Sequence, residues 1–211
     1  ESKSNRCNGM VTPLDANYGI MYKPFSFDLT PIYSLLAPRF PDLNIEGAVI
    51  QSEELWLFHR GNSEGGKSAL IMLPISALHS CLERVAPDAN DPVIRVKPLE
   101  LGTRDGVALT VTDATRLADG CVLFTAAAEN TSNTYDDGEC AGSVMGMLSP
   151  TGEMLWSEPL SGQDKVEGIA CKPDETGLTC LLVTDADSEN IAAKLLKLRL
   201  PTKMTGQASE T

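Results

Sequence analysis

The sequence predicts an all-β fold built from β-propeller blades of antiparallel strands, with two short helical inserts. Three observations predict it: short apolar runs separated by turn residues, an internal repeat of paired strands, and only two stretches with helical periodicity. Many short strands at regular spacing are typical of sandwiches, barrels and propellers. The apolar runs are Ala48–Ile50, Leu55–Phe58, Ala69–Leu73, Cys121–Thr125, Ser143–Leu148, Leu178–Val183 and Ala193–Leu200.

Two segments have helical signals. Pro31 opens the segment Ile32–Ala37, because proline at the first helical position loses no hydrogen bond, and Pro38 ends it. The segment Ser76–Val85 places its apolar side chains on one helical face, and Pro87 ends it. Upstream of both, residues 7–14 and 20–29 have the pattern of outer strands of an earlier blade.

The internal repeat is the key to the predicted architecture. Each unit holds an acidic residue at the start of one strand, a polar turn, and a second strand. Aligned in this way, Glu46, Asp113 and Glu167 take the same place. A period of this size, with several strands per unit, favours propeller blades, and coincidence among β-hairpins is the alternative. The units read NIEGAV with LWLFHRGN (44–62), VTDATRLADG with CVLFTAAAEN (111–130), and KVEGIA with CLLVTDAD (165–187).

Strand alternation predicts how these acids are placed. The second strand of each unit runs antiparallel to the first, so its far end returns to the edge where the acid lies. We therefore expect Glu46 near His59 and Arg60, and Glu167 near Asp185 and Asp187; Asp113 is expected near Ala128 and Glu129.

In a propeller the opening acids would meet at one mouth of the central channel. Two interpretations stay open: each acid is a structural latch that caps backbone amides of the next blade, or the acids together hold a metal ion or substrate.

The segments NIEGAVI, LWLFHRGN, YDDGEC (135–140), KVEGIA and LLVTDADSEN resemble those of an uncharacterised bacterial propeller family akin to the esterase-like phytase proteins. This resemblance runs from about residue 7 to residue 201. It implies a propeller of about six blades, of which the domain 1–201 is part, followed by a polar tail, 202–211. In similar propeller hydrolases, channel-mouth carboxylates hold a divalent cation. The resemblance therefore implies that role for Glu46 and Glu167, whereas Asp113 departs from the Glu-Gly pattern.

The predicted metal site consists of Glu46, Glu167, Asp185 and Asp187, which would hold Ca²⁺ or another divalent cation through carboxylate oxygens. Asp185, Asp187 and a second acidic loop at 136–139 are also consistent with solvated surface loops.

Two basic side chains at the end of one strand are the candidate catalytic residues. Arg60 would grip an anionic substrate or pair with Glu46 as a structural bridge. His59 would act as a general base or serve only in packing.

A P-loop pattern, GNSEGGKS, spans residues 61–68, but the following apolar run reads as a strand ended by Pro74 rather than as a phosphate-binding helix. Cys171 and Cys180 flank a turn, so a hairpin disulfide is one possibility for them. The cytoplasm is the default location, and the start of the sequence leaves a secreted or periplasmic protein open.

Composition limits the partners. The chain has 17 Lys and Arg against 29 Asp and Glu, a net charge of −12, which argues against nucleic acid. No apolar run is long enough to span a membrane. Two functions follow from these observations: a non-catalytic binding or scaffold protein for a protein, carbohydrate or other small-molecule partner, or a metal-dependent phosphoester or ester hydrolase.

Overall fold

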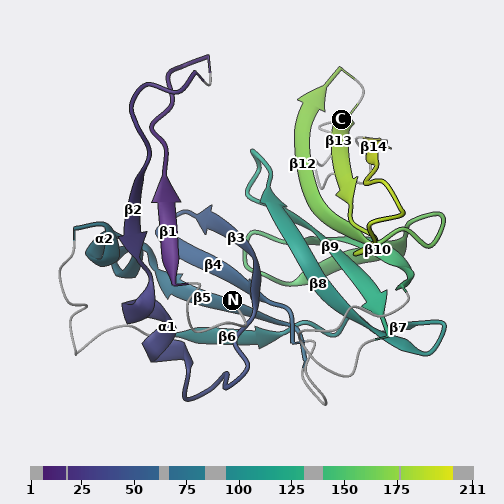
Figure 1. Ribbon diagram of the computed structural model, residues 1–211, viewed down its shortest axis with the longest axis horizontal. Coiled ribbons are helices and arrows are strands. Elements are labelled where there is room, and N and C mark those ends of the chain that lie inside the picture. Colours follow the sequence, from purple (N-terminus) through teal and green to yellow (C-terminus); the bar gives the residue numbers. More distant parts are fainter. Residues whose placement is uncertain are drawn as a thin grey trace, which may run out of the picture.

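The computed structural model describes residues 7–17, 19–61, 67–83, 94–130, 140–175 and 177–201. Three antiparallel sheets follow one another along the chain, and a hairpin precedes them (Figure 1). Every pair of neighbouring strands is antiparallel, because turns join strands that are consecutive in sequence. The hairpin consists of β1 (Asn8–Val11) and β2 (Phe25–Asp28).

Each sheet is a meander, in which strands that follow one another in the chain are neighbours in the sheet. The first sheet has the order β3-β4-β5-β6, the middle sheet β11-β10-β9-β8-β7, and the third sheet β12-β13-β14. Their bounds are β3 (Ile45–Gln51), β4 (Glu54–His59), β5 (Ala69–Pro74), β6 (Arg95–Pro98), β7 (Thr103–Arg104), β8 (Val107–Arg116), β9 (Val122–Glu129), β10 (Cys140–Leu148), β11 (Met154–Pro159), β12 (Val166–Asp174), β13 (Gly177–Thr184) and β14 (Leu195–Pro201).

Two short helices cover the outer face of the first sheet. Helix α1 (Thr30–Leu36) has proline in its first turn, and α2 (Ile75–Glu83) follows β5 directly. Ile32 of α1 and Ala77 of α2 are buried against Leu57 and other residues of the first sheet. The all-β prediction with two short helices is thus confirmed, although residues 84–87, where the second helix was expected to end, lie outside the described residues.

The middle sheet is packed on both faces. One apolar cluster joins Trp56 and Phe58 of the first sheet to Phe124 of the middle sheet. A second cluster joins Leu123 and Met145 of the middle sheet to the third sheet. Because successive residues of β9 point to opposite faces, all of its eight residues are buried.

The sheets approach most closely at β3, β8 and β12, since β8 contacts β3 on one side and β12 on the other. Gly47 of β3 allows this approach. A side-chain carbon added there would lie 3.0 Å from the backbone nitrogen of Ala114 and 3.3 Å from its Cβ. Glycine is therefore required by packing at this position.

A β-bulge in each of β3, β8 and β12 shows that the predicted alignment of the repeat has to be corrected. The pairing register shifts between Ile45 and Gly47, between Val111 and Asp113, and between Val166 and Gly168. The residues inside these bulges are Glu46, Thr112 and Glu167, so Thr112, not Asp113, shares the place of the two glutamates. The predicted alignment was one residue wrong in the middle unit, because the sequence pattern does not show which residue a bulge takes up.

The structure tests some of the remaining sequence predictions only in part, because some of their residues lie outside the described ranges. Strand β5 begins at Ala69, directly after the P-loop pattern, as expected, whereas residues 62–66 of that pattern lie outside the described residues. The tail 202–211 also lies outside them. No helix in the described part of the chain is long and apolar enough to cross a membrane. The ring of about six blades stays a prediction.

Cys171 of β12 and Cys180 of β13 lie directly opposite each other and form a disulfide. The bond closes a loop with a sequence separation of 9. We expect the double variant Cys171→Ala/Cys180→Ala to lose about 2–3 kcal/mol of unfolding free energy, because the open loop gives the unfolded chain more freedom. Urea unfolding should show this loss, and dithiothreitol should lower the wild type to the same level. A reductant effect that persists in the double variant would contradict this assignment.

Candidate functional site

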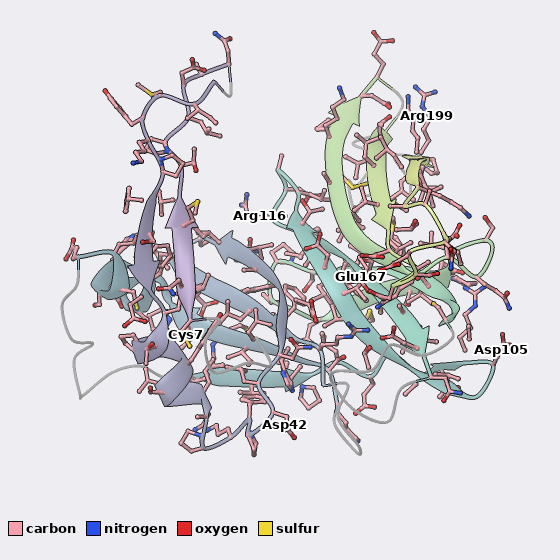
Figure 2. The ribbon with its side chains drawn as sticks, viewed as in Figure 1. Cys7, Asp42, Asp105, Arg116, Glu167 and Arg199 are labelled. Atoms are coloured by element: carbon pink, nitrogen blue, oxygen red, sulfur yellow. A yellow bond between two sulfur atoms is a disulfide. The ribbon has the colours of Figure 1, made fainter. Side chains whose placement is uncertain are left out.

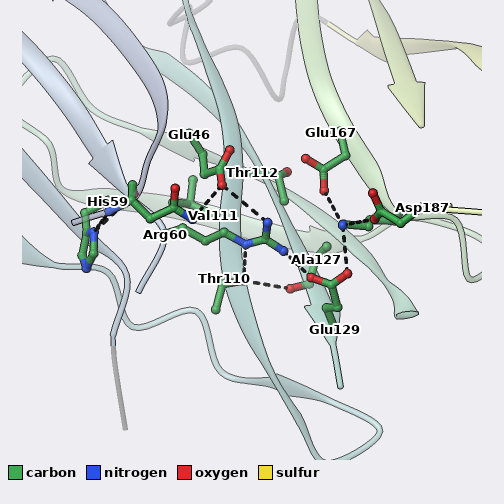
Figure 3. A network of polar contacts seen from close by, with 12 residues as sticks. Glu46, His59, Arg60, Thr110, Val111, Thr112, Ala127, Glu129, Glu167 and Asp187 are labelled. Carbon is green, nitrogen blue, oxygen red and sulfur yellow. Dashed lines mark hydrogen bonds and ion pairs between the residues drawn. The ribbon is translucent and has the colours of Figure 1, made fainter. Parts of the chain in front are cut away.

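A continuous network of ion pairs connects the three sheets near the bulges of β3, β8 and β12 (Figure 3). Its centre consists of Arg60, Glu129 and Lys165, whose side chains are 7%, 3% and 5% exposed. Glu46 lies at one end, and Glu167 and Asp187 lie at the other. The network therefore brings together residues more than 100 positions apart.

Arg60 follows β4 and reaches into the middle sheet. Its Nη2 atom donates to Glu129 Oε2 over 2.6 Å, and its Nε atom donates to Thr110 Oγ1 over 3.2 Å. Its Nη1 atom lies 3.5 Å from Glu46 Oε1, which also accepts a hydrogen bond of 2.9 Å from Asn44 Nδ2. The structural bridge between Arg60 and Glu46, one of the two expected roles, is therefore present.

Lys165, one residue before β12, contacts the remaining carboxylates of the network. Its Nζ atom lies 2.8 Å from Glu129 Oε1 and 3.3 Å from Glu167 Oε1, and it donates to Asp187 Oδ2. Burial disfavours the charged ammonium group, but the hydrogen bond to Asp187 and the attraction of the Glu129 and Glu167 carboxylates outweigh burial and raise the pKa of Lys165. This lysine is therefore charged at neutral pH.

The outer carboxylates are less buried than the centre. The side chains of Glu46 and Glu167 are 25% and 24% exposed. Burial raises the pKa of the Glu167 carboxyl, and the nearby Glu46 adds to this effect, whereas Lys165 and Arg60 oppose it. By formal charge, the four carboxylates of the network outnumber its two cations by two (4 − 2).

Asp113 is separate from this network and acts as a latch between sheets. Its Oδ2 atom accepts a hydrogen bond of 2.8 Å from the backbone nitrogen of Ile169 in β12, and Oδ1 accepts one of 2.8 Å from Ala114. Burial raises the pKa of this carboxyl although both hydrogen bonds lower it. The latch interpretation describes Asp113, while the repeat glutamates bind side-chain cations instead.

His59 points away from the network. Its Nδ1 atom lies 3.2 Å from both the backbone nitrogen and the carbonyl oxygen of Asn44, and its ring packs edge-on against Phe40 at 4.9 Å between ring centres. Neighbouring residues of a strand point to opposite faces, so His59 and Arg60 diverge. Burial lowers the pKa of His59.

We expect stability to fall as pH decreases through the range where His59 titrates. Its folded pKa is lowered, so the unfolded chain binds the proton at higher pH, and unfolding becomes easier between about pH 7 and pH 5.5. Each unit of pKa lowering costs up to about 1.4 kcal/mol. Denaturant unfolding of His59→Asn should lose this pH dependence. The variant His79→Asn, at the exposed second histidine, should keep it, and a flat wild-type profile would contradict the expectation.

Asp185 is not part of the network. Its Oδ1 atom accepts a hydrogen bond of 2.9 Å from the backbone nitrogen of Asp187, which forms a local turn and lets Asp187 reach Lys165. Within the described ranges, no group of three or more His, Cys, Asp or Glu side chains is arranged to hold a metal ion. Residues 136–139, the second acidic loop, lie outside those ranges.

Sequence reasoning found Arg60 as the partner of Glu46 but missed the buried residues that join the two halves of the network. Lys165 and Glu129 were not candidate site residues, yet they form the buried centre. One signal was available: Asn44, Thr110 and Lys165 each precede the bulge residue by two positions, and each contacts the network. A polar residue repeated at that place indicates a shared structural role.

A pocket of about 260 Å³ adjoins the network at Lys165. Its lining includes the pair Lys194–Asp164, whose Nζ and Oδ1 atoms lie 2.7 Å apart, together with Gln163 and Thr184. Ile191, Ala192, Ala186 and Cys140 complete the wall. The pocket thus combines hydrogen-bonding groups of both kinds with a small apolar surface.

Comparison with known proteins identifies a family for this chain but indicates no activity. A family model described as a family of unknown function (DUF6910) matches residues 1–189. No curated protein and no solved structure matches the chain. The likeness to esterase-like phytase proteins therefore stays an expectation.

Proposed function

This chain belongs to the DUF6910 family, and because no function is known for that family we propose one from geometry: a non-catalytic binding protein on a propeller scaffold. The observation that carries this proposal is the engagement of the predicted metal ligands by the chain's own cations. Arg60 contacts Glu46, and Lys165 contacts Glu167 and Asp187. Cations already placed between carboxylates favour a structural centre over a reactive one.

The finer part of the proposal is a ring of about six such sheets. Three features support it: each sheet is a meander, the strands β3, β8 and β12 of the three sheets are neighbours, and the sheets pack face to face. Blades of a propeller are arranged in this way around a central axis.

We propose that the pocket beside Lys165 binds a carbohydrate. The cavity of about 260 Å³ suits a small ligand rather than a protein segment. Gln163, Asp164, Lys194 and Thr184 offer donors and acceptors for hydroxyl groups, and Ile191 offers apolar surface. The acidic surface of the protein would not favour a strongly anionic ligand.

A panel of neutral monosaccharides, titrated by NMR, tests this proposal. We expect shifts of backbone amides around the pocket with at least one sugar at millimolar concentration. The variant Gln163→Ala should weaken this binding, and Lys67→Met, which removes a side chain that is 74% exposed and pairs with exposed Glu100, should not. Absence of pocket shifts with every sugar would reject the carbohydrate proposal.

The second candidate is the metal-dependent phosphoester or ester hydrolase. It is favoured by one observation, the excess of two negative charges in a network whose outer carboxylates, Glu46 and Glu167, stay about one-quarter exposed. A divalent cation would neutralise that excess and would polarise a bound ester or phosphoester.

We expect addition of Ca²⁺ or Mn²⁺ to leave the melting temperature unchanged, because Arg60 and Lys165 already engage the acids. A metal at about 100 times its dissociation constant would add about 2.7 kcal/mol, a rise of roughly 5–10 °C for a chain of this size. Thermal melting with each metal and with a chelator distinguishes the two candidates. A rise that Glu167→Gln abolishes would favour the hydrolase over the non-catalytic role.

A further inference from the structure

The loop between β13 and β14, residues 185–194, forms part of the wall of the pocket described above. It begins after Thr184, which pairs with Val166 at the start of β12. Figure 2 shows Glu167 at this end of the third sheet and Arg199 away from it. The rest of the pocket wall comes from β10, β13 and the segment that precedes β12. Four residues of the loop line the pocket: Ala186, Ile191, Ala192 and Lys194.

The 185–194 loop is attached to the third sheet mainly through its two ends. Among the described residues, its backbone hydrogen bonds lie at those ends or within the loop. At the ends, the Thr184 nitrogen donates to the Lys194 carbonyl oxygen over 3.1 Å, and inside the loop the Ile191 nitrogen donates to the Ser188 carbonyl oxygen over 3.2 Å. A segment with local hydrogen bonds and exposed residues opens at a lower free-energy cost than a strand within a sheet.

Two ion pairs of opposite polarity connect the loop to the pocket wall. The Nζ atom of Lys194 in the loop donates to Oδ1 of Asp164 in the wall over 2.7 Å. The Nζ atom of Lys165 in the wall donates to Oδ2 of Asp187 in the loop. Asp164 and Lys165 are consecutive in the chain, so both pairs lie along the same part of the wall. Each pair therefore holds one end of the loop against the wall.

Both ion pairs break at a low free-energy cost. When Asp187 is released, Lys165 keeps two carboxylates, with Glu129 Oε1 at 2.8 Å and Glu167 Oε1 at 3.3 Å. The buried ammonium group is therefore not left unpaired, which is the costly outcome for a buried ion pair. The other pair has side chains that are 53% and 33% exposed, so water solvates both groups when they separate. Opening of the loop thus leaves the ion-pair network intact.

We propose that the 185–194 loop is a lid of the pocket, which opens to admit a ligand and is held closed by the two ion pairs. Ile191 lines the pocket although it is 57% exposed, so a bound ligand would cover apolar surface on the lid and favour the closed state. This inference deepens the proposed binding function and rests on it, but opening of the lid is measurable without any ligand.

The reaction of Cys140 with iodoacetamide, followed by peptide mass spectrometry, is the first test. Cys140 is a free thiol in the pocket wall, so its reaction rate reports the open fraction. We expect Asp187→Asn and Lys194→Met each to raise this rate about two- to fivefold, the range for ion pairs of this exposure. The two variants change the local charge in opposite directions, so a rise in both cannot come from a change in thiol acidity.

Matched controls separate lid opening from other effects. Glu189→Gln changes an exposed acid of the same loop, and Lys197→Met an exposed lysine of β14, and neither residue is among those that line the pocket. Both controls should leave the Cys140 rate unchanged. Cys81 and Cys121 are buried free thiols, so their rates report unfolding of the whole molecule. Rates in the two lid variants equal to those in the controls, or an equal acceleration of Cys121, would overturn the lid.

The same measurement with the panel of neutral monosaccharides separates this inference from the carbohydrate proposal. A sugar that binds in the pocket should slow the reaction of Cys140 in the wild type and less strongly in Lys194→Met. If no sugar slows the reaction but both lid variants accelerate it, the lid is supported and the carbohydrate proposal is rejected. If a sugar slows the reaction but neither variant changes the rate without sugar, the lid alone is rejected.

Discussion

Replacement of Lys165 by methionine is expected to lower the free energy of unfolding by about 3 kcal/mol or more. Among the described residues, two cations contact Glu129, whose side chain is 3% exposed, and the change removes one of them and leaves Arg60. It also leaves Asp187 and Glu167 without their ion pair. Removal of one partner of a buried ion pair costs about 3–5 kcal/mol, because a desolvated charge stays behind. Urea unfolding at neutral pH measures the loss.

The control is Lys67→Met, which removes an exposed pair whose atoms are 3.9 Å apart and should change stability by less than about 1 kcal/mol. The double variant Lys165→Met/Glu129→Gln should recover part of the loss, since it removes one of the stranded carboxylates. The pKa of Lys165 is raised in the folded state, so its stabilisation is complete below the ordinary lysine value of 10.5 and declines at higher pH. Equal losses for Lys165→Met and Lys67→Met would refute a structural role for the network.

Gly47→Val is expected to destabilise the protein by about 3 kcal/mol through steric conflict rather than charge. The added Cβ would lie 3.0 Å from the backbone nitrogen of Ala114 in β8. Backbone atoms of a central strand have little freedom to move, so the first and middle sheets would have to separate. Apolar contacts of Trp56 and Phe124 between those sheets would loosen as well. Thermal or urea unfolding, at one fixed protein concentration, tests this expectation.

Ala108→Val provides the comparison, because Ala108 is an exposed residue within β8 and valine is well suited to strands. Its effect should be within about 0.5 kcal/mol. Gly47→Ala should lie between the two, since it adds the same first carbon without the branched methyl groups. If Gly47→Val were as stable as Ala108→Val, the close approach of β3 and β8 would not be a constraint on this fold.

Several features of the candidate site followed from the residues alone. The antiparallel return of β4 placed Arg60 beside Glu46, and the equivalent geometry in the third sheet placed Asp187 near Glu167. The same logic was wrong for Asp113, because a bulge at Thr112 shifts the register by one residue. It also gave no reason to select Lys165, since lysine is usually a surface residue and its burial depends on three sheets meeting.

The amino-acid sequence by itself determined most of the strands, both short helices and the presence of a repeat, since these depend on local periodicity and on turn residues. It also supplied the glutamates at equivalent places. Only the tertiary structure decided what those glutamates contact. Arg60 and Lys165 are buried between them, and each contacts one carboxylate oxygen of Glu129. The reason is physical. Periodicity fixes which face a side chain takes, whereas the bulges and the packing distance between sheets fix which charges come within a few ångströms of one another.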